Sequence, residues 1–141
     1  MSVSLSALAF LAHAVVEIPA AASFVLTPQR QLSPAAATPE VLLVLQNLGG
    51  LLVASVLASL VLVARGHAIA PSTRGLLALA LGSYHFFPCR RAALRLRHDI
   101  GIRGPQGRTL GGPRVHLVVH LVCLALLVLA GLTDVIVARH E

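Results

Sequence analysis

The stretch VLLVLQNLGGLLVASVLASLVLVA, residues 41–64, contains no charged side chain and is long enough to cross a bilayer. A helix needs about 20 apolar residues to span the hydrocarbon core. Three further apolar runs lie on either side of it, at about residues 4–26, 71–87 and 115–138. The run at 71–87 is the weakest, because Arg74 lies near its start and Pro88 follows it. We expect an all-α polytopic membrane protein, a bundle of four transmembrane helices that forms one domain over residues 1–141.

The composition agrees with this expectation and excludes an ordinary soluble domain. Of the 141 residues, 57% are hydrophobic and only 11% are charged, and the mean hydropathy is +0.86. Soluble domains carry about 25% charged residues.

Capping residues predict where the helices begin. Thr38 and Pro39 predict a helix start near Glu40, Ser72 is a candidate cap for the third helix, and Pro113 indicates the start of the fourth.

All eleven basic residues are arginines, and they are distributed unevenly. Eight lie in residues 27–40 and 88–114, whereas only Arg65, Arg74 and Arg139 lie on the opposite side of a four-span chain. The positive-inside rule therefore predicts a cytosolic Arg-rich loop at 88–114 and termini on the lumenal or outer side. Residues 88–99 (PCRRAALRLRHD) are expected to continue the third helix as an amphipathic extension. Arginines this close to membrane helices favour anionic lipid headgroups as partners, and we expect no nucleic-acid binding.

One face of the first predicted helix combines small and ionisable side chains. Residues Ala9, His13, Glu17 and Ala21 are four apart, so they share a face. An ionised carboxylate in hydrocarbon costs several kcal/mol, which is why such groups face partners or a cavity. His13 is one expected partner for Glu17, because side chains at i and i+4 meet on a helix. We therefore expect this face to point into the bundle.

The other three predicted helices place polar side chains at a similar depth. At about 1.5 Å of rise per residue, Glu17 lies roughly 13 Å from the Arg-rich side and His120 about 9 Å. We expect a cavity open toward the cytosolic leaflet, lined by Glu17, Gln46, Asn47, Tyr84, His85, His116 and His120. On the second helix, the small residues Gly50, Ala54 and Ala58 predict close packing that closes the opposite half of the bundle.

The first functional hypothesis is an enzyme that performs acid/base chemistry on a lipophilic metabolite of lipid or secondary metabolism. A carboxyl group and imidazoles in one cavity can exchange protons with a substrate, as isomerisation, cyclisation and hydration require. The sequence has no nucleotide-binding fingerprint, and we expect no cofactor and no metal. The candidate catalytic residues are Glu17, His120, His85 and His13, and the candidate substrate-binding residues are Gln46, Asn47, Tyr84 and His116.

Two other hypotheses remain open at this point. A non-catalytic scaffold for membrane enzymes would use the same polar side chains as interhelical hydrogen bonds, worth about 0.6 kcal/mol each. Metal or proton-coupled transport is the third, since two pairs of ligand-type residues are spaced i, i+4, namely His85 with Cys89 and His116 with His120. A path through four short spans would require a homo-oligomer.

Three segments, HAVVEIPAAASF (13–24), YHFFPCRRAALRLR (84–97) and GGPRVHLVVH (111–120), are set in a four-span layout. In this the chain resembles small fungal integral membrane proteins, some of which are similar in size and number of spans to the scaffold protein of sterol biosynthesis. The resemblance implies a protein of the endoplasmic reticulum connected with lipid or secondary metabolism. It transfers no functional residue to this chain.

Overall fold

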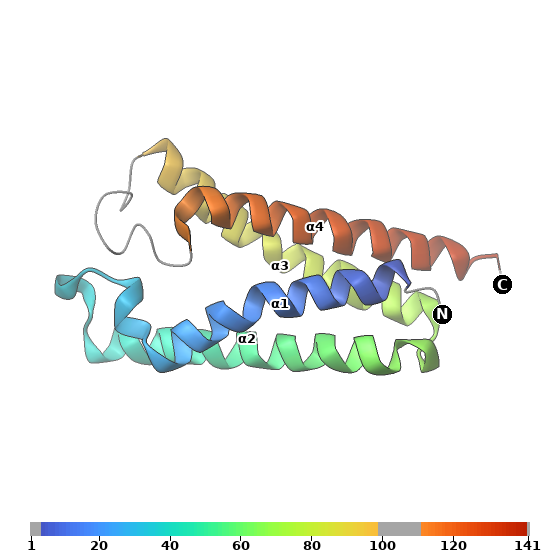
Figure 1. Cartoon of the computed structure of the whole chain (residues 1–141), viewed down its shortest axis with the longest axis horizontal. Helices are drawn as coiled ribbons and strands as arrows, with labels where there is room; N and C mark the ends of the chain where they lie inside the picture. Colours follow the sequence, from blue (N-terminus) through green and yellow to red (C-terminus); the bar gives the residue numbers. More distant parts are fainter. Residues whose placement is uncertain (1–3, 99–110, 141) are drawn as a thin grey trace.

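A computed structural model describes residues 4–98 and 111–140, and within these ranges every regular element is helical. Four long helices follow one another along the chain, and each runs antiparallel to the one before it (Figure 1). They are α1 (Leu5–Leu26), α2 (Pro39–Arg65), α3 (Pro71–Arg97) and α4 (Gly112–Val137). Short 3-10 turns at Pro28–Gln31, Pro34–Ala36 and Gly66–Ala68 lie in the first two connections. The first and last described residues therefore lie at the same end of the bundle (Figure 1).

Three of the described helices are long and apolar enough to cross a membrane, namely α1, α2 with the turn that follows it (Pro39–Ala68), and α4. Large hydrophobic side chains such as Val15, Leu57 and Val118 are exposed on their outer faces, as suits a helix surrounded by lipid. The helix α3 does not meet the same criterion, because arginines occur in its first turn and throughout its last turns. The chain is thus all-helical with three apolar helices, which is compatible with a membrane protein.

The predicted helix starts are confirmed at two places and wrong at one. The Thr38 hydroxyl caps α2 by accepting a hydrogen bond from the Val41 amide at 3.4 Å, and α4 begins at Gly112, directly before Pro113. Ser72 is not a cap, because α3 already begins at Pro71. Proline suits the first helical position, where its missing N–H has no intrahelical partner to lose.

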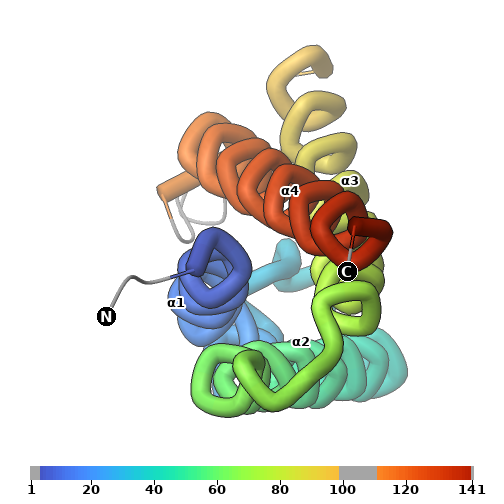
Figure 2. The backbone as a smooth tube through the Cα atoms, turned by 90° about the vertical axis from the view of Figure 1, so that its right-hand side faces the viewer, coloured from blue at the N-terminus to red at the C-terminus, as the bar shows by residue number. Residues whose placement is uncertain are grey.

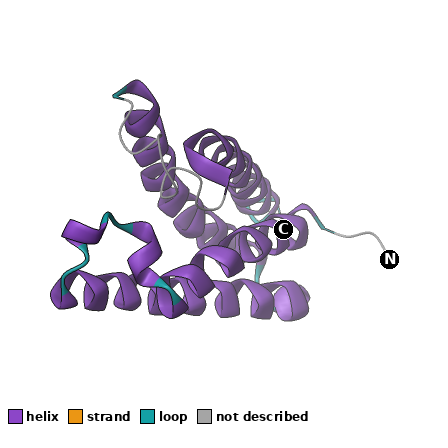
Figure 3. Cartoon of the chain, turned by 60° about the vertical axis from the view of Figure 1, so that its left-hand side comes forward, coloured by secondary structure: helices purple, strands orange, loops and turns teal. Residues whose placement is uncertain are grey.

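The helix α3 runs through Pro88 without ending and continues to Arg97. A proline inside a helix removes one backbone hydrogen bond, and neighbouring helices can compensate for that loss in a bundle. The helical extension expected over residues 88–99 is therefore present as far as Arg97, with His98 as the C-cap, and residue 99 lies outside the described residues. Figure 3 shows this end of α3 diverging from the α1–α2 pair.

The helices associate as two close pairs, α1 with α2 and α3 with α4, and α1 also packs against α4. Figure 2 shows the four helices end on, with α1 and α4 adjacent. Glycine permits the closest contacts. A Cβ atom on Gly75 would lie 2.8 Å from the Gly131 carbonyl oxygen, and one on Gly49 would lie 2.7 Å from the Val25 side chain. These positions let the backbones of each pair approach one another.

The predicted small-residue stripe on α2 does not pack inside the bundle. Gly50, Ala54 and Ala58 are exposed, and a Cβ atom on Gly50 would meet nothing within 4 Å. The buried face of α2 consists instead of Gly49, Leu52, Val56, Ser59 and Leu62. Consecutive residues on a helix are separated by about 100°, so an error of one residue turns the expected face away from the neighbours.

Candidate functional site

The helix α1 carries the polar face that the sequence predicts. Ala9, His13 and Glu17 are fully buried and Ala21 is 4% exposed, because α1 lies between α2 on one side and α4 on the other. His13 and Glu17 are therefore both removed from lipid and from solvent. The expected contact between them is replaced by others, since the ring nitrogens of His13 bond to residues of α2 and α3.

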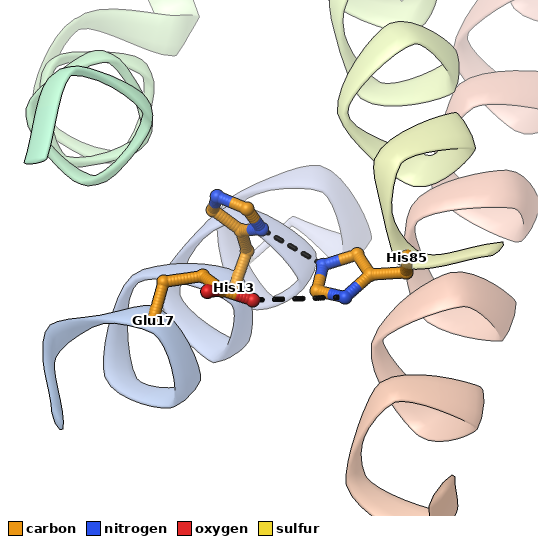
Figure 4. Close-up of side chains that lie close together, drawn as sticks. All are labelled: His13, Glu17 and His85. Carbon is orange, nitrogen blue, oxygen red and sulfur yellow. Dashed lines mark hydrogen bonds and ion pairs between the residues drawn. The ribbon is translucent and has the colours of Figure 1, made fainter. Parts of the chain in front are cut away.

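Three buried histidines from three different helices form a continuous chain. Nδ1 of His13 on α1 lies 2.8 Å from Nε2 of His85 on α3 (Figure 4). The other nitrogen of the His85 ring, Nδ1, lies 2.8 Å from Nδ1 of His120 on α4. Both separations are those of short hydrogen bonds. The chain therefore connects α1, α3 and α4 at one level of the bundle.

A serine at one end of this chain determines where the imidazole protons lie. The Ser55 hydroxyl donates to the Leu52 carbonyl oxygen at 2.9 Å, so its oxygen accepts a hydrogen bond from Nε2–H of His13 at 3.3 Å. In a neutral His13, Nδ1 then carries a lone pair and accepts from Nε2–H of His85. As a result, Nδ1 of a neutral His85 carries a lone pair, and it accepts a hydrogen bond from Nδ1–H of His120.

The Glu17 carboxyl group completes a cluster with these histidines and is only partly satisfied. Its Oε1 is 3.8 Å from Nδ1 of His85 (Figure 4) and 3.6 Å from Nδ1 of His120, and it has no hydrogen-bond partner among the described residues. The Tyr84 hydroxyl donates to Oε2 at 3.4 Å. A buried polar atom without a partner costs about 1–3 kcal/mol and calls for an explanation.

A pocket next to this cluster opens between α1 and α4. It has a volume of about 180 Å³ and is lined by Val15, Val16, Pro19, Ala20, Val115, His116, Val119 and His120. Most of these side chains are apolar. His120 belongs both to the pocket and to the cluster, and the half-buried His116 ring lies one turn away with its centroid 5.6 Å from that of His120. The pocket therefore borders the cluster at His120.

The structure gathers six of the eight predicted site residues and separates the other two. Four of the six, Glu17, His13, His85 and His120, form the cluster; Tyr84 contacts it and His116 lies beside it. Gln46 and Asn47 instead lie on the exposed face of α2, for the same rotational reason as Gly50. The expected broad cavity is thus replaced by a closed cluster with a pocket at its edge.

Sequence reasoning missed two features of the interior. Ser55 was not among the predicted site residues, although its hydroxyl oxygen lies 3.3 Å from Nε2 of His13 at the end of the histidine chain. Sequence reasoning also treated Arg74 as a topological charge, whereas Arg74 binds both oxygens of Asp134 at 2.7 and 2.8 Å. Ser6 donates to the same carboxylate at 2.6 Å. The available signal was Asp134 itself, a carboxylate in an otherwise apolar helix that required a cation nearby.

No protein-family model, no curated protein and no solved structure is significantly similar to the chain.

Proposed function

We propose that the protein is an integral membrane enzyme that performs acid/base chemistry on a lipophilic small molecule at the buried Glu17–histidine cluster. The observation that carries the proposal is Oε1 of Glu17, a fully buried carboxyl oxygen without a hydrogen-bond partner among the described residues and within 4 Å of two imidazoles. A group left in this state costs stability. A buried carboxyl oxygen without a partner is understandable when a bound substrate supplies the missing hydrogen bond.

Each member of the cluster has a distinct role in this proposal. Glu17 exchanges a proton with the substrate, and His120 acts as the complementary acid or base because it also lines the α1–α4 pocket. His85 and His13 position these groups through their hydrogen bonds, and Tyr84 orients the carboxyl group. Reactions that add a proton at one atom and remove it at another fit this set. Isomerisation, cyclisation and hydration of a lipid or secondary metabolite are of this kind.

The apolar lining of the pocket supports a lipophilic substrate. The pocket lies between two of the helices that are apolar enough to cross a membrane, so a molecule dissolved in the bilayer reaches it without passing through water. Ligand sites are typically concave and apolar with a few polar groups that fix orientation. His116 and His120 are those polar groups here.

The proposal includes a four-span topology in which α3 is the remaining crossing. The described arginines of α3 beyond Pro88, together with Arg30 and Arg114, lie at the end of the bundle opposite the described ends of the chain (Figure 1), which favours a cytosolic location for that end. In a eukaryotic cell we assign the protein to the endoplasmic reticulum. Thiol labelling of single cysteines introduced at the exposed Ala70 and Arg97 tests this topology. They should react from opposite sides of the membrane, and reaction from the same side would exclude a crossing by α3.

The enzymatic proposal is tested by comparing two glutamates in the same protein. Membranes containing the native chain, Glu17→Gln or Glu40→Gln are incubated with a lipid extract of the native host, and mass spectrometry follows the products. Glu40 is exposed and serves as the matched control. We expect a product that is isomeric with its precursor, or one water heavier, from the native chain and Glu40→Gln only. Equal conversion by Glu17→Gln would refute the role of Glu17.

A scaffold function is the second candidate, and the exposed face of α2 favours it. Asn47, Gly50 and Ala54 are exposed on an apolar helix, where small and polar side chains allow a partner helix to approach closely. The partner would be a transmembrane helix of a biosynthetic enzyme. Gly50→Leu should then abolish co-purification of that enzyme while Glu17→Gln should not. Co-purification that survives Gly50→Leu would contradict the scaffold function, and loss of turnover in Glu17→Gln but not in Gly50→Leu would support the catalytic proposal.

A further inference from the structure

We infer that the buried cluster is a binding site for one divalent transition-metal ion, held by Oε1 of Glu17, Nδ1 of His85 and Nδ1 of His120. The inference deepens the proposed function and rests on it for the role of the ion, although not for its binding. With an ion present, Glu17 and His120 are ligands. The chemistry that a bound ion would supply is the activation of a water molecule, which would take over the proton transfer from Glu17 and His120.

The distances between the three ligand atoms carry the inference. The two imidazole nitrogens are 2.8 Å apart, and they lie 3.8 and 3.6 Å from the carboxyl oxygen. A point equidistant from the three atoms lies about 2 Å from each, which is the length of a Zn–N or Zn–O bond in proteins. One ion therefore fits between them without movement of the helices.

The hydrogen-bond chain prepares His85 as a ligand. A metal-bound imidazole is neutral and uses its other N–H to bond to a second residue, which fixes the ring orientation. His85 donates Nε2–H to His13, and His13 in turn donates Nε2–H to Ser55. Nδ1 of His85 thus carries a lone pair rather than a proton, and His120 releases its Nδ1 proton when the ion takes the place of the hydrogen bond between the two rings. Ligand atoms of His13, Glu17 and His85 also lie within 4.8 Å of one another, but the position of His13 behind His85 makes it a positioning residue.

The carboxyl group is prepared in the same way. Tyr84 donates to Oε2 of Glu17, which leaves Oε1 for the ion. The absence of a hydrogen-bond partner for Oε1 among the described residues is then explained, because the ion is its partner. A divalent ion also compensates the buried negative charge, since no cation is bonded to Glu17 in the described part of the chain.

The ligand set points to a class of metal ion. Two imidazole nitrogens and one carboxylate oxygen suit Zn²⁺ and the neighbouring divalent ions, whereas Ca²⁺ and Mg²⁺ prefer ligand sets made of oxygen. Three protein ligands leave at least one coordination position open, as in catalytic rather than structural zinc sites. His120 is the ligand that borders the α1–α4 pocket, so the open position is reachable from that side.

Metal binding can be measured directly, without a substrate. The full chain is purified in detergent, stripped with a chelator and titrated with Zn²⁺ by calorimetry and with Co²⁺ by visible absorption. We expect one equivalent to bind, with the visible bands of a Co²⁺ site that has nitrogen and oxygen ligands. Glu17→Gln, His85→Gln and His120→Gln should each weaken binding at least 100-fold. His13→Ala should weaken it about 10- to 100-fold, as is usual for a residue that orients a ligand.

The matched control is His116→Gln, on the same helix and at the edge of the same pocket, which should leave the affinity unchanged. Circular dichroism and size exclusion check that every variant is folded. The inference is overturned when the native chain binds no Zn²⁺, or when His116→Gln and His120→Gln weaken binding equally. Strong sulfur-to-cobalt absorption would also overturn it, because it would place Cys89 or Cys123 in the site.

The same preparation separates this inference from the proposed function. Turnover that survives complete removal of metal would show that the side chains act alone and would exclude a catalytic ion. Tight metal binding by a protein that shows no turnover would instead support the metal site and refute the proposed enzymatic function. Loss of turnover on stripping, with recovery on addition of Zn²⁺ to the native chain but not to His120→Gln, is the result expected when both hold.

Discussion

Two carboxylates lie in the interior of the helix bundle, and they have opposite surroundings. Asp134 on α4 accepts two hydrogen bonds from Arg74 at 2.7 and 2.8 Å and one from Ser6 at 2.6 Å. Glu17 on α1 accepts a single long hydrogen bond, from Tyr84 at 3.4 Å. Yet Glu17 is the more deeply buried of the two, with an exposed fraction of 0% against 8% for Asp134.

Under the proposed function, the difference separates a structural carboxylate, Asp134, from a functional one, Glu17. Asp134 has a cation and a hydroxyl donor as partners, and nothing further is needed to account for its burial. Glu17 is surrounded instead by Tyr84, His85 and His120, and one of its oxygens has no hydrogen-bond partner among the described residues. A polar atom that the fold leaves without a partner can bind a substrate or an ion. The two sites should therefore respond in opposite ways to mutation.

The largest expected effect is on activity, from Glu17→Gln. Loss of a positioned acid or base typically lowers the rate about 10²–10⁴-fold, and the amide also removes the charged ligand of a metal ion. Stability should stay the same or rise, because a buried and incompletely paired carboxyl group is replaced by a neutral side chain of equal size. Turnover and thermal unfolding measured on the same preparation check both parts. A large drop in stability would show that Glu17, like Asp134, has a structural role.

The next largest effect is on stability, from Arg74→Met. Removal of one partner of a fully buried ion pair costs about 3–5 kcal/mol, because the other charge is left without compensation. The Arg74–Asp134 pair is partly buried, so the loss should lie at or below the lower end of that range. The double variant Arg74→Met, Asp134→Leu should recover much of that loss, since no charge then remains buried. Denaturation of the three proteins in mixed detergent micelles gives the free energies of unfolding. The pair is not the source of the effect if the double variant is as unstable as the single one.

Two adjacent glycines on α2 give a smaller and more local contrast. Gly49→Ala brings a methyl group within 2.7 Å of Val25 and should cost about 1–3 kcal/mol, as other overpacked sites do. Gly50→Ala meets nothing within 4 Å and should change stability by less than about 0.5 kcal/mol. Equal effects at the two positions would mean that α2 is rotated differently from the face described above.

The smallest effects are expected at Gln46 and Asn47. Both are exposed on α2, so Gln46→Leu and Asn47→Leu should leave turnover and Zn²⁺ affinity unchanged. The measurements are those already used for Glu17. A loss of activity at either position would show that these amides take part in substrate binding, and it would contradict their separation from the cluster.

The sequence predicts the helices and the polar face of α1 because both depend on local spacing. His13 and Glu17 are four apart in a helix whose other faces are apolar, so their shared face points inward. The gathering of His85 and His120 in the same half of the bundle as Glu17 was also predictable, since each was counted from the same Arg-rich boundary. These local regularities account for the members of the cluster.

The rotation of α2 was not predictable from the sequence in the same way. Residues 41–64 are apolar on every side, so periodicity does not distinguish the face that packs from the face that meets lipid. Close packing selected Gly49 instead of Gly50, and that choice moved Gln46 and Asn47 outward and Ser55 inward. The pairing of Arg74 with Asp134 was missed for another reason, because it joins residues of α3 and α4 that lie far apart in the sequence.

The central claim is that Glu17, His85 and His120 meet in one buried cluster, and solid-state NMR in lipid bilayers tests it directly. Dipolar couplings are measured between a ¹³C-labelled glutamate carboxyl group and ¹⁵N-labelled histidine rings, with Glu17→Gln as the subtraction control. Oε1 of Glu17 lies 3.8 Å from Nδ1 of His85 and 3.6 Å from Nδ1 of His120. We therefore expect strong couplings to two rings, each lost in His85→Gln or His120→Gln respectively. No coupling between the Glu17 carboxyl group and any histidine ring would contradict the account.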